Sequence, residues 1–260
     1  MPDCKVTADS LSAWFAGAQG NYILAREQAY FSRSVSDIFG FNAAQLGLPE
    51  HDFLANSRMS LRFNGSPQAG SAVRLCHDEL PFASDSLDLL LLPHVLEFCQ
   101  QPHQVLREAQ RVLLPEGSLL LSGFNPRSLW GLRRAFGNRS EFPWKGDFIA
   151  LHRLKDWMSV LGFEVVGGCF AGYAPPFNRE KWLRRYAFME KAGDRWWAVG
   201  GGIYFLHAVK RVYGVRPLKP QWKHSLVGKL LPATPKINKE ELIKSVRTGK
   251  TKGAGKVDPQ

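Results

Sequence analysis

Polar side chains that could do chemistry follow three apolar runs in the middle of the chain: Asp78 and Glu79, then His94, then Asn125. An unperturbed imidazole titrates near neutrality, so His94 is a candidate general base. The alternative interpretation is that His94 caps a helix or bonds a backbone group. In the same way, Asp78 and Glu79 either hold a ligand or form a solvated turn, and Asn125 either reaches a ligand or starts a turn with the proline that follows it.

The elements that must position these side chains are short strands joined by a helix. Leu87–Leu92 is a mainly apolar run, too short for a helix and typical of a parallel strand covered on both faces. Pro102 begins a predicted helix that has one apolar stripe, and Pro115 ends this helix. The next predicted strand is Ser118–Ser122. Strand, helix and strand with short links indicate a parallel crossover unit.

Similar patterns flank this unit on both sides. Strands are predicted at 43–48, 59–63, 72–76, 163–170 and 202–209, and a helix at 154–161 that Gly162 closes. Near the start, Gly20 is predicted to separate two helices, with Asn21 as the N-cap of the second one. Alternating helices and strands of this kind indicate an α/β protein.

The stretch 75–130 carries a chain of short motifs in a fixed order. They are an acid followed by L-P-F, S-x-D before an apolar strand, H-V-L-E after it, and L-R-E-x-x-R-V-L-x-P-x-G before the next strand. Together they closely resemble the third to fifth strands of class I S-adenosylmethionine-dependent methyltransferases of the ubiquinone/menaquinone-methyltransferase-like (type 11) group. The resemblance extends over roughly residues 40–210.

The resemblance implies a fold, a cofactor and a reaction. The implied fold is Rossmann-like: a mostly parallel seven-stranded sheet with helices on both faces and an antiparallel last strand. The implied cofactor is S-adenosylmethionine, and the implied reaction is transfer of its methyl group to an unidentified acceptor. In such a sheet, ligands bind at the carboxyl ends of the strands. The residues expected there are Gly47, Asn64, Asp78, Glu79, Leu80, Pro93 and His94 for the cofactor, and Asn125 for the substrate.

The first half of the methyltransferase-like region departs from the pattern of that group. In the group, a glycine-rich turn lets backbone amides approach the cofactor. Here only Gly47 of that turn remains, and Pro49 and Glu50 follow it. No acid ends the second predicted strand, where Asn64 is the available hydrogen-bonding side chain. The alternative function is therefore a catalytically inactive methyltransferase-like module that binds RNA or a protein partner.

The chain is divided by these patterns into three parts. We expect an N-terminal helical extension (1–39), a methyltransferase-like domain (40–212) and a tail (213–260). Within the domain, the insertion 171–200 mixes basic and aromatic residues, and Arg179 and Trp182 are candidates for substrate contact in a lid. The same residues could instead stack bases and contact phosphates, or the aromatic ones could lie in the core.

Charge is concentrated in the tail. Residues 211–260 hold 12 of the 34 Lys and Arg but 3 of the 23 Asp and Glu, in a chain whose net charge is +11. We expect this tail to be disordered and to contact RNA or another polyanion weakly. The sequence has no apolar stretch of membrane-spanning length, no secretory signal pattern and no metal-ligand spacing, so we expect a cytoplasmic protein without a metal.

Overall fold

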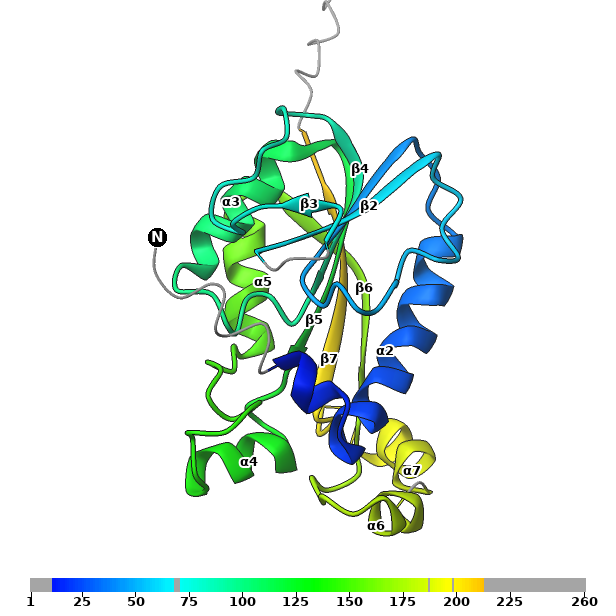
Figure 1. Ribbon diagram of the computed structural model, residues 1–260, viewed down its shortest axis with the longest axis vertical. Helices are drawn as coiled ribbons and strands as arrows, with labels where there is room; N and C mark the ends of the chain where they lie inside the picture. Colours follow the sequence, from blue (N-terminus) through cyan, green and yellow to red (C-terminus); the bar gives the residue numbers. More distant parts are fainter. Residues whose placement is uncertain (1–10, 68–70, 187, 198, 213–260) are drawn as a thin grey trace, which may run out of the picture. The chain divides into compact units, whose positions relative to one another are not determined.

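A seven-stranded sheet forms the centre of the molecule (Figure 1). The computed structural model describes residues 11–67, 71–186, 188–197 and 199–212. The strand order is β3-β2-β1-β4-β5-β7-β6, and β7 runs antiparallel to both of its neighbours while the other pairs are parallel. The predicted sheet, with its antiparallel last strand, is confirmed. Its strands are β1 (Asn42–Leu46), β2 (Leu61–Ser66), β3 (Val73–Arg74), β4 (Leu87–Pro93), β5 (Leu113–Phe124), β6 (Phe163–Ala171) and β7 (Ile203–Lys210).

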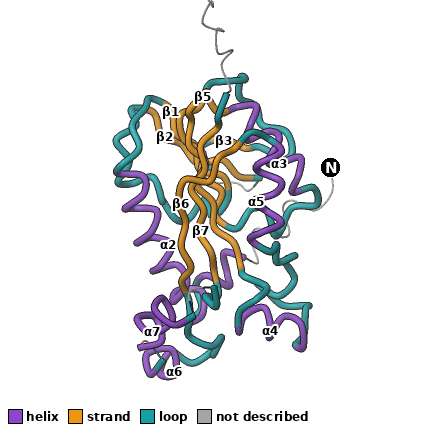
Figure 2. The backbone as a smooth tube through the Cα atoms, turned by 180° about the vertical axis from the view of Figure 1, so that it is seen from behind, coloured by secondary structure: helices purple, strands orange, loops and turns teal. Residues whose placement is uncertain are grey.

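Helices cover both faces of the sheet, as Figures 1 and 2 show from opposite sides. On one face lie α3 (Pro102–Val112) and α5 (Leu151–Val160), and on the other lies α2 (Ala18–Ser36). The apolar stripe predicted from Pro102 onward is buried against the sheet, and Leu154 and Met158 of α5 are buried beside it. Gly162 ends α5 with a φ of +80°, as its position predicted.

The connection from β1 to β2 has no helix. Residues 47–60 run as turns and irregular backbone, yet Leu48, Phe53, Leu54 and Met59 within them are buried. The Phe53 ring lies 5.0 Å from that of Phe31 on α2. An apolar loop therefore fills the space on this face beside α2.

The predicted boundary between the first two helices is wrong. Residues 11–15 are helical, but α2 begins at Ala18, so Gly20 and Asn21 lie inside its first turns. A Cβ at Gly20 would stand 2.3 Å from the Phe15 Cα. Gly20 is thus a close-packing glycine and not a helix stop. The Asn21 side chain donates a hydrogen bond to the Ala16 carbonyl, at 3.1 Å.

The segments after β5 and β6 gather at the end of the sheet where the parallel strands finish (Figures 1 and 2). They contain α4 (Leu129–Phe136), α6 (Glu180–Arg185) and α7 (Phe188–Trp196). The insertion 171–200 forms the two short helices α6 and α7. None of the described helices is long and apolar enough to cross a membrane. The basic tail, which we placed at 213–260, lies outside the described residues.

Candidate functional site

The carboxyl ends of β1, β4 and β5 lie side by side. Register pairs Gln45 of β1 with Leu91 of β4, and Pro93 of β4 with Ser122 of β5. The loops that follow these strands therefore start from one edge, as expected for an open parallel sheet. The predicted residues Gly47, His94 and Asn125 each stand directly or almost directly after one of these strands.

His94 lies at the centre of a buried charged cluster. Its backbone is left-handed, with a φ of +50°, and its side chain is fully buried. One ring nitrogen, Nε2, lies 3.0 Å from the Glu27 carboxylate, and the other, Nδ1, lies 3.0 Å from that of Glu97. Burial lowers the pKa of His94, but the two carboxylates outweigh it and raise the pKa to about 10. His94 is thus an imidazolium held between two anions.

The two carboxylates are themselves anchored to β5. Ser122 donates its hydroxyl to Glu27 Oε1 at 2.6 Å, and the backbone amide of Phe124 donates to Glu97 Oε1. Burial, and then the nearby Glu97, raise the pKa of the Tyr204 phenol well above its usual value. The cluster therefore joins α2, the β4 loop and β5 through charges that are removed from water.

Aromatic rings close this cluster off. The Phe124 ring lies 4.3 Å from that of His94, and the Phe15 ring lies 5.8 Å from it on the N-terminal side. Phe15 itself is fully buried. In this arrangement both ring nitrogens of His94 face carboxylates, so the side chain braces the loop through Glu27 and Glu97. This differs from the helix cap or backbone bond that the sequence offered as the alternative. A general-base role for His94 stays a prediction that would require the cluster to open.

The loop after β1 is shaped by one glutamine. Gln45 donates its amide to three loop carbonyls, those of residues 47, 48 and 51, and accepts from the Phe53 amide. Gly47 has a φ of +84°, and a Cβ there would stand 3.0 Å from Val95 Cγ2. The close approach that needs this glycine is thus with the β4 loop. Glu50, further along, accepts a hydrogen bond from Ser12 at 2.8 Å.

Asn64 ties two loops together. Its Nδ2 donates to the Pro49 carbonyl at 3.2 Å, and its Oδ1 accepts from the Ala72 amide at 2.8 Å. Both polar atoms of the side chain are thus engaged by the protein. Contact with a ribose hydroxyl stays a prediction, and it would have to share or replace these bonds.

The segment after β3 is fixed by its backbone to α3. Glu108 accepts from the Leu80 amide at 2.9 Å, and Arg111 donates to the Leu80 carbonyl at the same distance. Gln104 donates to the Asp78 carbonyl at 3.4 Å. Leu80 is buried, while Glu79 is exposed. The backbone is held in place and the side chains of His77 and Asp78 are left for other contacts.

His77 and Asp78 contain buried polar atoms without partners. Among the described residues, neither His77 Nε2 nor Asp78 Oδ1 meets a hydrogen-bond partner. Burial lowers the pKa of His77 to about 4 and raises that of Asp78. An unpaired buried polar atom costs free energy, so these two atoms are candidates for contact with a polar ligand.

Asn125 holds the end of the insertion. Its Nδ2 donates to the carbonyls of Val199 and Gly201, at 2.7 and 2.9 Å, and its Oδ1 accepts from the Arg127 amide. The side chain is buried and its hydrogen-bonding capacity faces the protein. Its contact with a substrate stays a prediction.

Arg179 and Trp182 lie on the outer side of the insertion. Both are exposed, and the Trp182 ring packs against those of Phe177 and Tyr186. The insertion is fastened to α2 through Glu190, which pairs with Arg26 at 3.0 Å and accepts from the Tyr22 hydroxyl. These contacts fix the insertion to α2, and the Asn125 bonds fix its end beside the carboxyl end of β5. Its action as a substrate lid stays a prediction.

Glu27 is the residue that sequence reasoning missed. It belongs to the series Ile23, Glu27, Phe31 and Val35, which repeats every four residues and is buried throughout. A carboxylate in the middle of an apolar helical stripe is rarely buried without a partner. That signal was visible, although nothing in the sequence named His94 as the partner 67 positions away.

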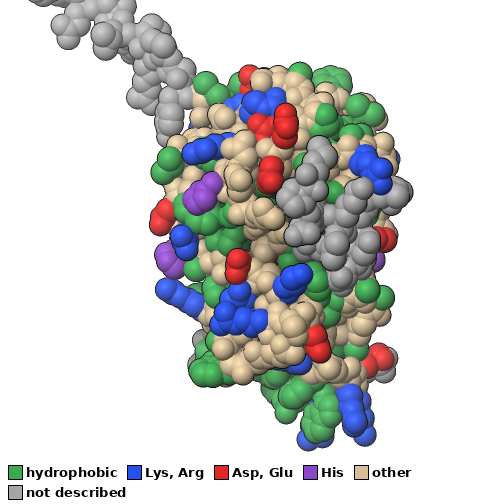
Figure 3. All heavy atoms as spheres, turned by 60° about the vertical axis from the view of Figure 1, so that its left-hand side comes forward, with side chains coloured by type: hydrophobic (Ala, Val, Ile, Leu, Met, Phe, Trp, Pro, Cys, Tyr) green, Lys and Arg blue, Asp and Glu red, His purple; other side chains and the backbone are tan. Residues whose placement is uncertain are grey.

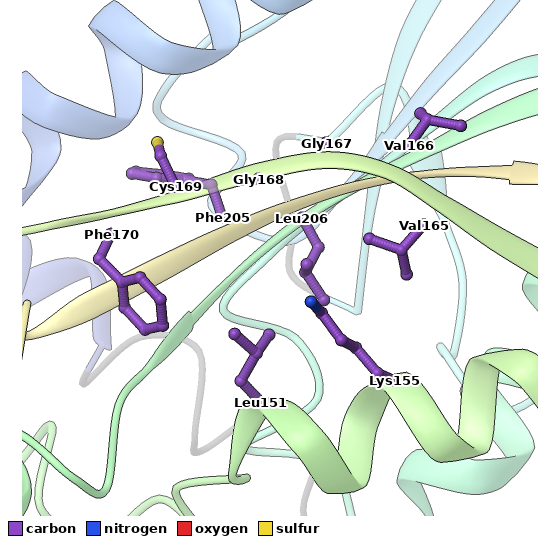
Figure 4. A pocket seen from close by; sticks show the side chains of 10 residues that line it. All are labelled: Leu151, Lys155, Val165, Val166, Gly167, Gly168, Cys169, Phe170, Phe205 and Leu206. Carbon is purple, nitrogen blue, oxygen red and sulfur yellow. The ribbon is translucent and has the colours of Figure 1, made fainter. Parts of the chain in front are cut away.

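A separate groove lies at the edge of the sheet (Figure 4). It has a volume of about 280 Å³ between α5 and β6, and Gly167 and Gly168 expose side chains of β7 to it. Lys155 is the one ionisable side chain in its lining apart from the Cys169 thiol. The groove therefore lacks the polar groups that the carboxyl edge brings together. Within the described residues, no group of three or more His, Cys, Asp or Glu could hold a metal ion.

Comparison with known proteins matches the middle of the chain to one domain family. The sequence profile described as "Methyltransferase domain" matches residues 49–121. The uncharacterized protein YafS of Escherichia coli (strain K12) is 39% identical over 133 residues, covering 50% of this chain and 55% of that protein. A malonyl-[acyl-carrier protein] O-methyltransferase of Methylovorus sp. (strain MP688) is 34% identical over 88 residues, covering 34% of this chain and 30% of that protein. The chain thus spans about half or less of these relatives.

A solved structure shares the fold. A SAM-dependent methyltransferase of Thermotoga maritima, described as a possible histamine N-methyltransferase, aligns with a TM-score of 0.53 at 16% identity. The alignment covers 71% of this chain and 89% of that one. At this identity the likeness concerns the fold alone.

Proposed function

We propose that this chain, which belongs to the class I S-adenosylmethionine-dependent methyltransferases of type 11, transfers a methyl group from S-adenosylmethionine to an acceptor. The observation that carries the proposal is the pair of buried, unpartnered atoms at His77 and Asp78. They stand on the segment after β3, where this family holds the adenosine part of its cofactor. Their chemistry suits a nucleoside, since a carboxylate accepts from an amino or hydroxyl group and an imidazole nitrogen donates or accepts.

The residues fit the adenosine end better than the methionine end. Asp78 would receive a hydrogen bond there, and Leu80 would supply apolar contact beside it. At the other end, Pro49 has no amide to donate and Glu50 already accepts from Ser12. The cofactor's carboxylate would therefore depend on other amides of this loop and on movement of Glu50.

The chain contributes positioning and exclusion of water. S-adenosylmethionine, when bound, supplies a methyl group on a sulfonium that is already activated. The protein then has to align that group with an acceptor, and alignment alone lowers the barrier substantially. The ionised cluster of Glu27, His94 and Glu97 keeps the β4 loop rigid, and Phe15 shields it from solvent. While the cluster stays closed, His94 holds its proton between the two carboxylates.

Calorimetric titration with S-adenosylmethionine and S-adenosylhomocysteine tests the proposal. The wild-type protein should bind both, and Asp78→Asn should weaken binding about tenfold or more, because a charged hydrogen-bond acceptor is lost. Asp156→Asn, which changes an exposed carboxylate on α5, is the matched control and should bind normally. Absence of heat from folded protein at millimolar ligand, or equal affinity of Asp78→Asn, would refute the proposal.

A second function is supported by a specific observation. Glu50 and Asn64, which the family resemblance assigns to the methionine and ribose ends of the cofactor, already bond within the protein. These contacts favour an inactive module that binds a protein or RNA. For RNA, the basic tail is the proposed contact. Binding of neither cofactor form, together with salt-sensitive retention of RNA by the full chain, would favour this function over methyl transfer.

A further inference from the structure

Exposed apolar side chains are concentrated at the carboxyl end of the sheet. Of the 14 large hydrophobic residues exposed among the described ones, eight lie on α4 or between 177 and 199. They are Leu129, Leu132, Phe136, Phe177, Trp182, Phe188, Trp197 and Val199. Figures 1 and 2 both place α4, α6 and α7 at this end. We call these eight residues the apolar rim.

The α4 part of the rim is one face of a helix. Leu129, Leu132 and Phe136 are 44%, 53% and 84% exposed, and their spacing of three and four residues puts them on the same side. The opposite side is fixed: Trp130 is buried and donates to the Ala174 carbonyl at 2.9 Å. Arg133 also donates to the Pro176 carbonyl. The exposed face is thus held rigidly and joined to the insertion.

The insertion continues the rim with aromatic side chains. Trp182 is 41% exposed and Phe188 is 65% exposed, and Tyr186 connects them through ring contacts. The Arg185 guanidinium lies 5.7 Å from the Trp182 ring centre. An aromatic surface combined with cations is typical of proteins that lie at a membrane interface.

The charge around the rim is positive. Among the described side chains of 127–147 and 177–199, seven exposed ones are basic and three are acidic. The basic ones are Arg127, Arg139, Lys145, Arg179, Lys181, Arg185 and Arg195. One of the acidic ones, Asp147, pairs with Arg134 at 2.8 Å. Figure 3 shows Lys and Arg side chains among hydrophobic ones at the lower end of the molecule.

We propose that the apolar rim docks the protein on the surface of a bilayer that contains anionic phospholipids. Leucine and phenylalanine side chains would enter the boundary between headgroups and acyl chains, the indoles would lie at headgroup level, and the basic side chains would pair with phosphates. This binding is peripheral, and it does not depend on methyl transfer. It would turn the carboxyl edge, with the candidate site, toward the membrane.

Two other occupants fit the same surface less well. In a symmetric contact with a second copy of the chain, two identical surfaces would meet, each with seven exposed basic side chains, and these would repel one another. Single-stranded nucleic acid would use the aromatic rings and the cations, but it would leave Leu129, Leu132 and Val199 without apolar partners. A lipid surface satisfies both the aliphatic and the charged side chains.

Vesicle flotation of the full-length protein tests the proposal. Vesicles of phosphatidylcholine alone are compared with vesicles that also contain phosphatidylglycerol, at low and at raised salt. We expect binding to the anionic vesicles that persists in part at raised salt, because apolar burial is not screened. Leu132→Glu/Phe136→Glu and Trp182→Glu should each reduce the bound fraction about tenfold or more.

Matched controls separate the rim from the rest of the chain. Val160→Glu replaces a residue that is 88% exposed on α5, outside the rim, and should bind like the wild type. Thermal melts by circular dichroism should show all variants folded. Equal binding by the rim variants and the wild type, or no binding at all, would overturn the proposal. A self-association or an RNA shift that these variants abolish, without vesicle binding, would overturn it as well.

Discussion

At the scale of single residues, the most unusual feature is a histidine charged in the interior. Two buried carboxylates surround His94, and each is hydrogen-bonded to β5. Removal of one partner from a buried ion pair leaves the remaining charge under-compensated, which costs more than the pair itself contributes. The cluster should therefore respond strongly to substitutions that alter charge without altering shape.

Glu27→Gln should lower the free energy of unfolding by about 2–4 kcal/mol, because the amide keeps the shape but removes one of the two anions that compensate His94. Urea denaturation monitored by circular dichroism measures the change. Glu79→Gln, on an exposed carboxylate, is a control that should leave the midpoint nearly unchanged. If both variants unfold at the wild-type midpoint, the buried charge pair does not support the fold.

The same cluster predicts how stability depends on pH. His94 has an ordinary pKa of 6.5 and a pKa of about 10 in the fold, so the folded state binds the proton more tightly. Its stabilisation should be complete below pH 6.5 and should be lost as the pH rises toward about 10. Unfolding free energies measured across this window should fall for the wild type and fall less for His94→Gln. Parallel curves for the two proteins would show that His94 is neutral in the fold.

Sequence reasoning reached part of this site. Glu97 stands three residues after His94, a spacing that is visible in the sequence, and it contacts the His94 ring. The left-handed backbone of His94 and the distant Glu27 partner were beyond reach, because both depend on how α2 packs across β4 and β5. Short-range spacing indicates neighbours on one loop, whereas tertiary partners have no periodic signature.

At the scale of elements, patterns of apolar residues predicted the strands that cross the core. Leu87–Leu92 and Ser118–Ser122 are the central parallel pair, because both faces of these strands are covered. The helix at 102–112 was equally clear from its stripe. The β1–β2 connection could not be predicted from the sequence, since its buried residues occur without helical or strand periodicity.

Gly20 shows how a local rule fails in tertiary context. Glycine commonly ends a helix, but here a bare backbone is needed where α2 crosses the preceding turn. Gly20→Ala should lower the free energy of unfolding by about 1–3 kcal/mol, because the new Cβ would overlap the backbone of Phe15 and Trp14. Thermal or urea unfolding of Gly20→Ala and of the wild type measures this change in the free energy of unfolding.

Gly167→Ala is the matched control for this prediction. A Cβ at Gly167 meets nothing closer than the His207 Cβ, at 4.0 Å, and Gly167 is not among the residues with a positive φ. We expect little change in stability for this variant. If Gly20→Ala also leaves the free energy of unfolding unchanged, the two N-terminal helical segments do not pack as closely as described.

At the scale of the whole molecule, the carboxyl end of the sheet collects most of what is functionally informative. The buried charged cluster, the unpartnered atoms of His77 and Asp78, and the apolar rim all belong to loops and helices that follow the parallel strands. This agrees with the general rule that open parallel sheets bind ligands at that edge. The motif order over 75–130 predicted the edge, but the rim combines segments that the sequence separates by tens of residues.

The most direct test of the central claim is a crystal structure of the protein with S-adenosylhomocysteine. We predict the adenosine part within hydrogen-bonding distance of the Asp78 carboxylate, beside Leu80, so that the buried Oδ1 gains a partner. The ligand bound elsewhere, such as in the groove along β6, with Asp78 Oδ1 still unpaired, would contradict the account.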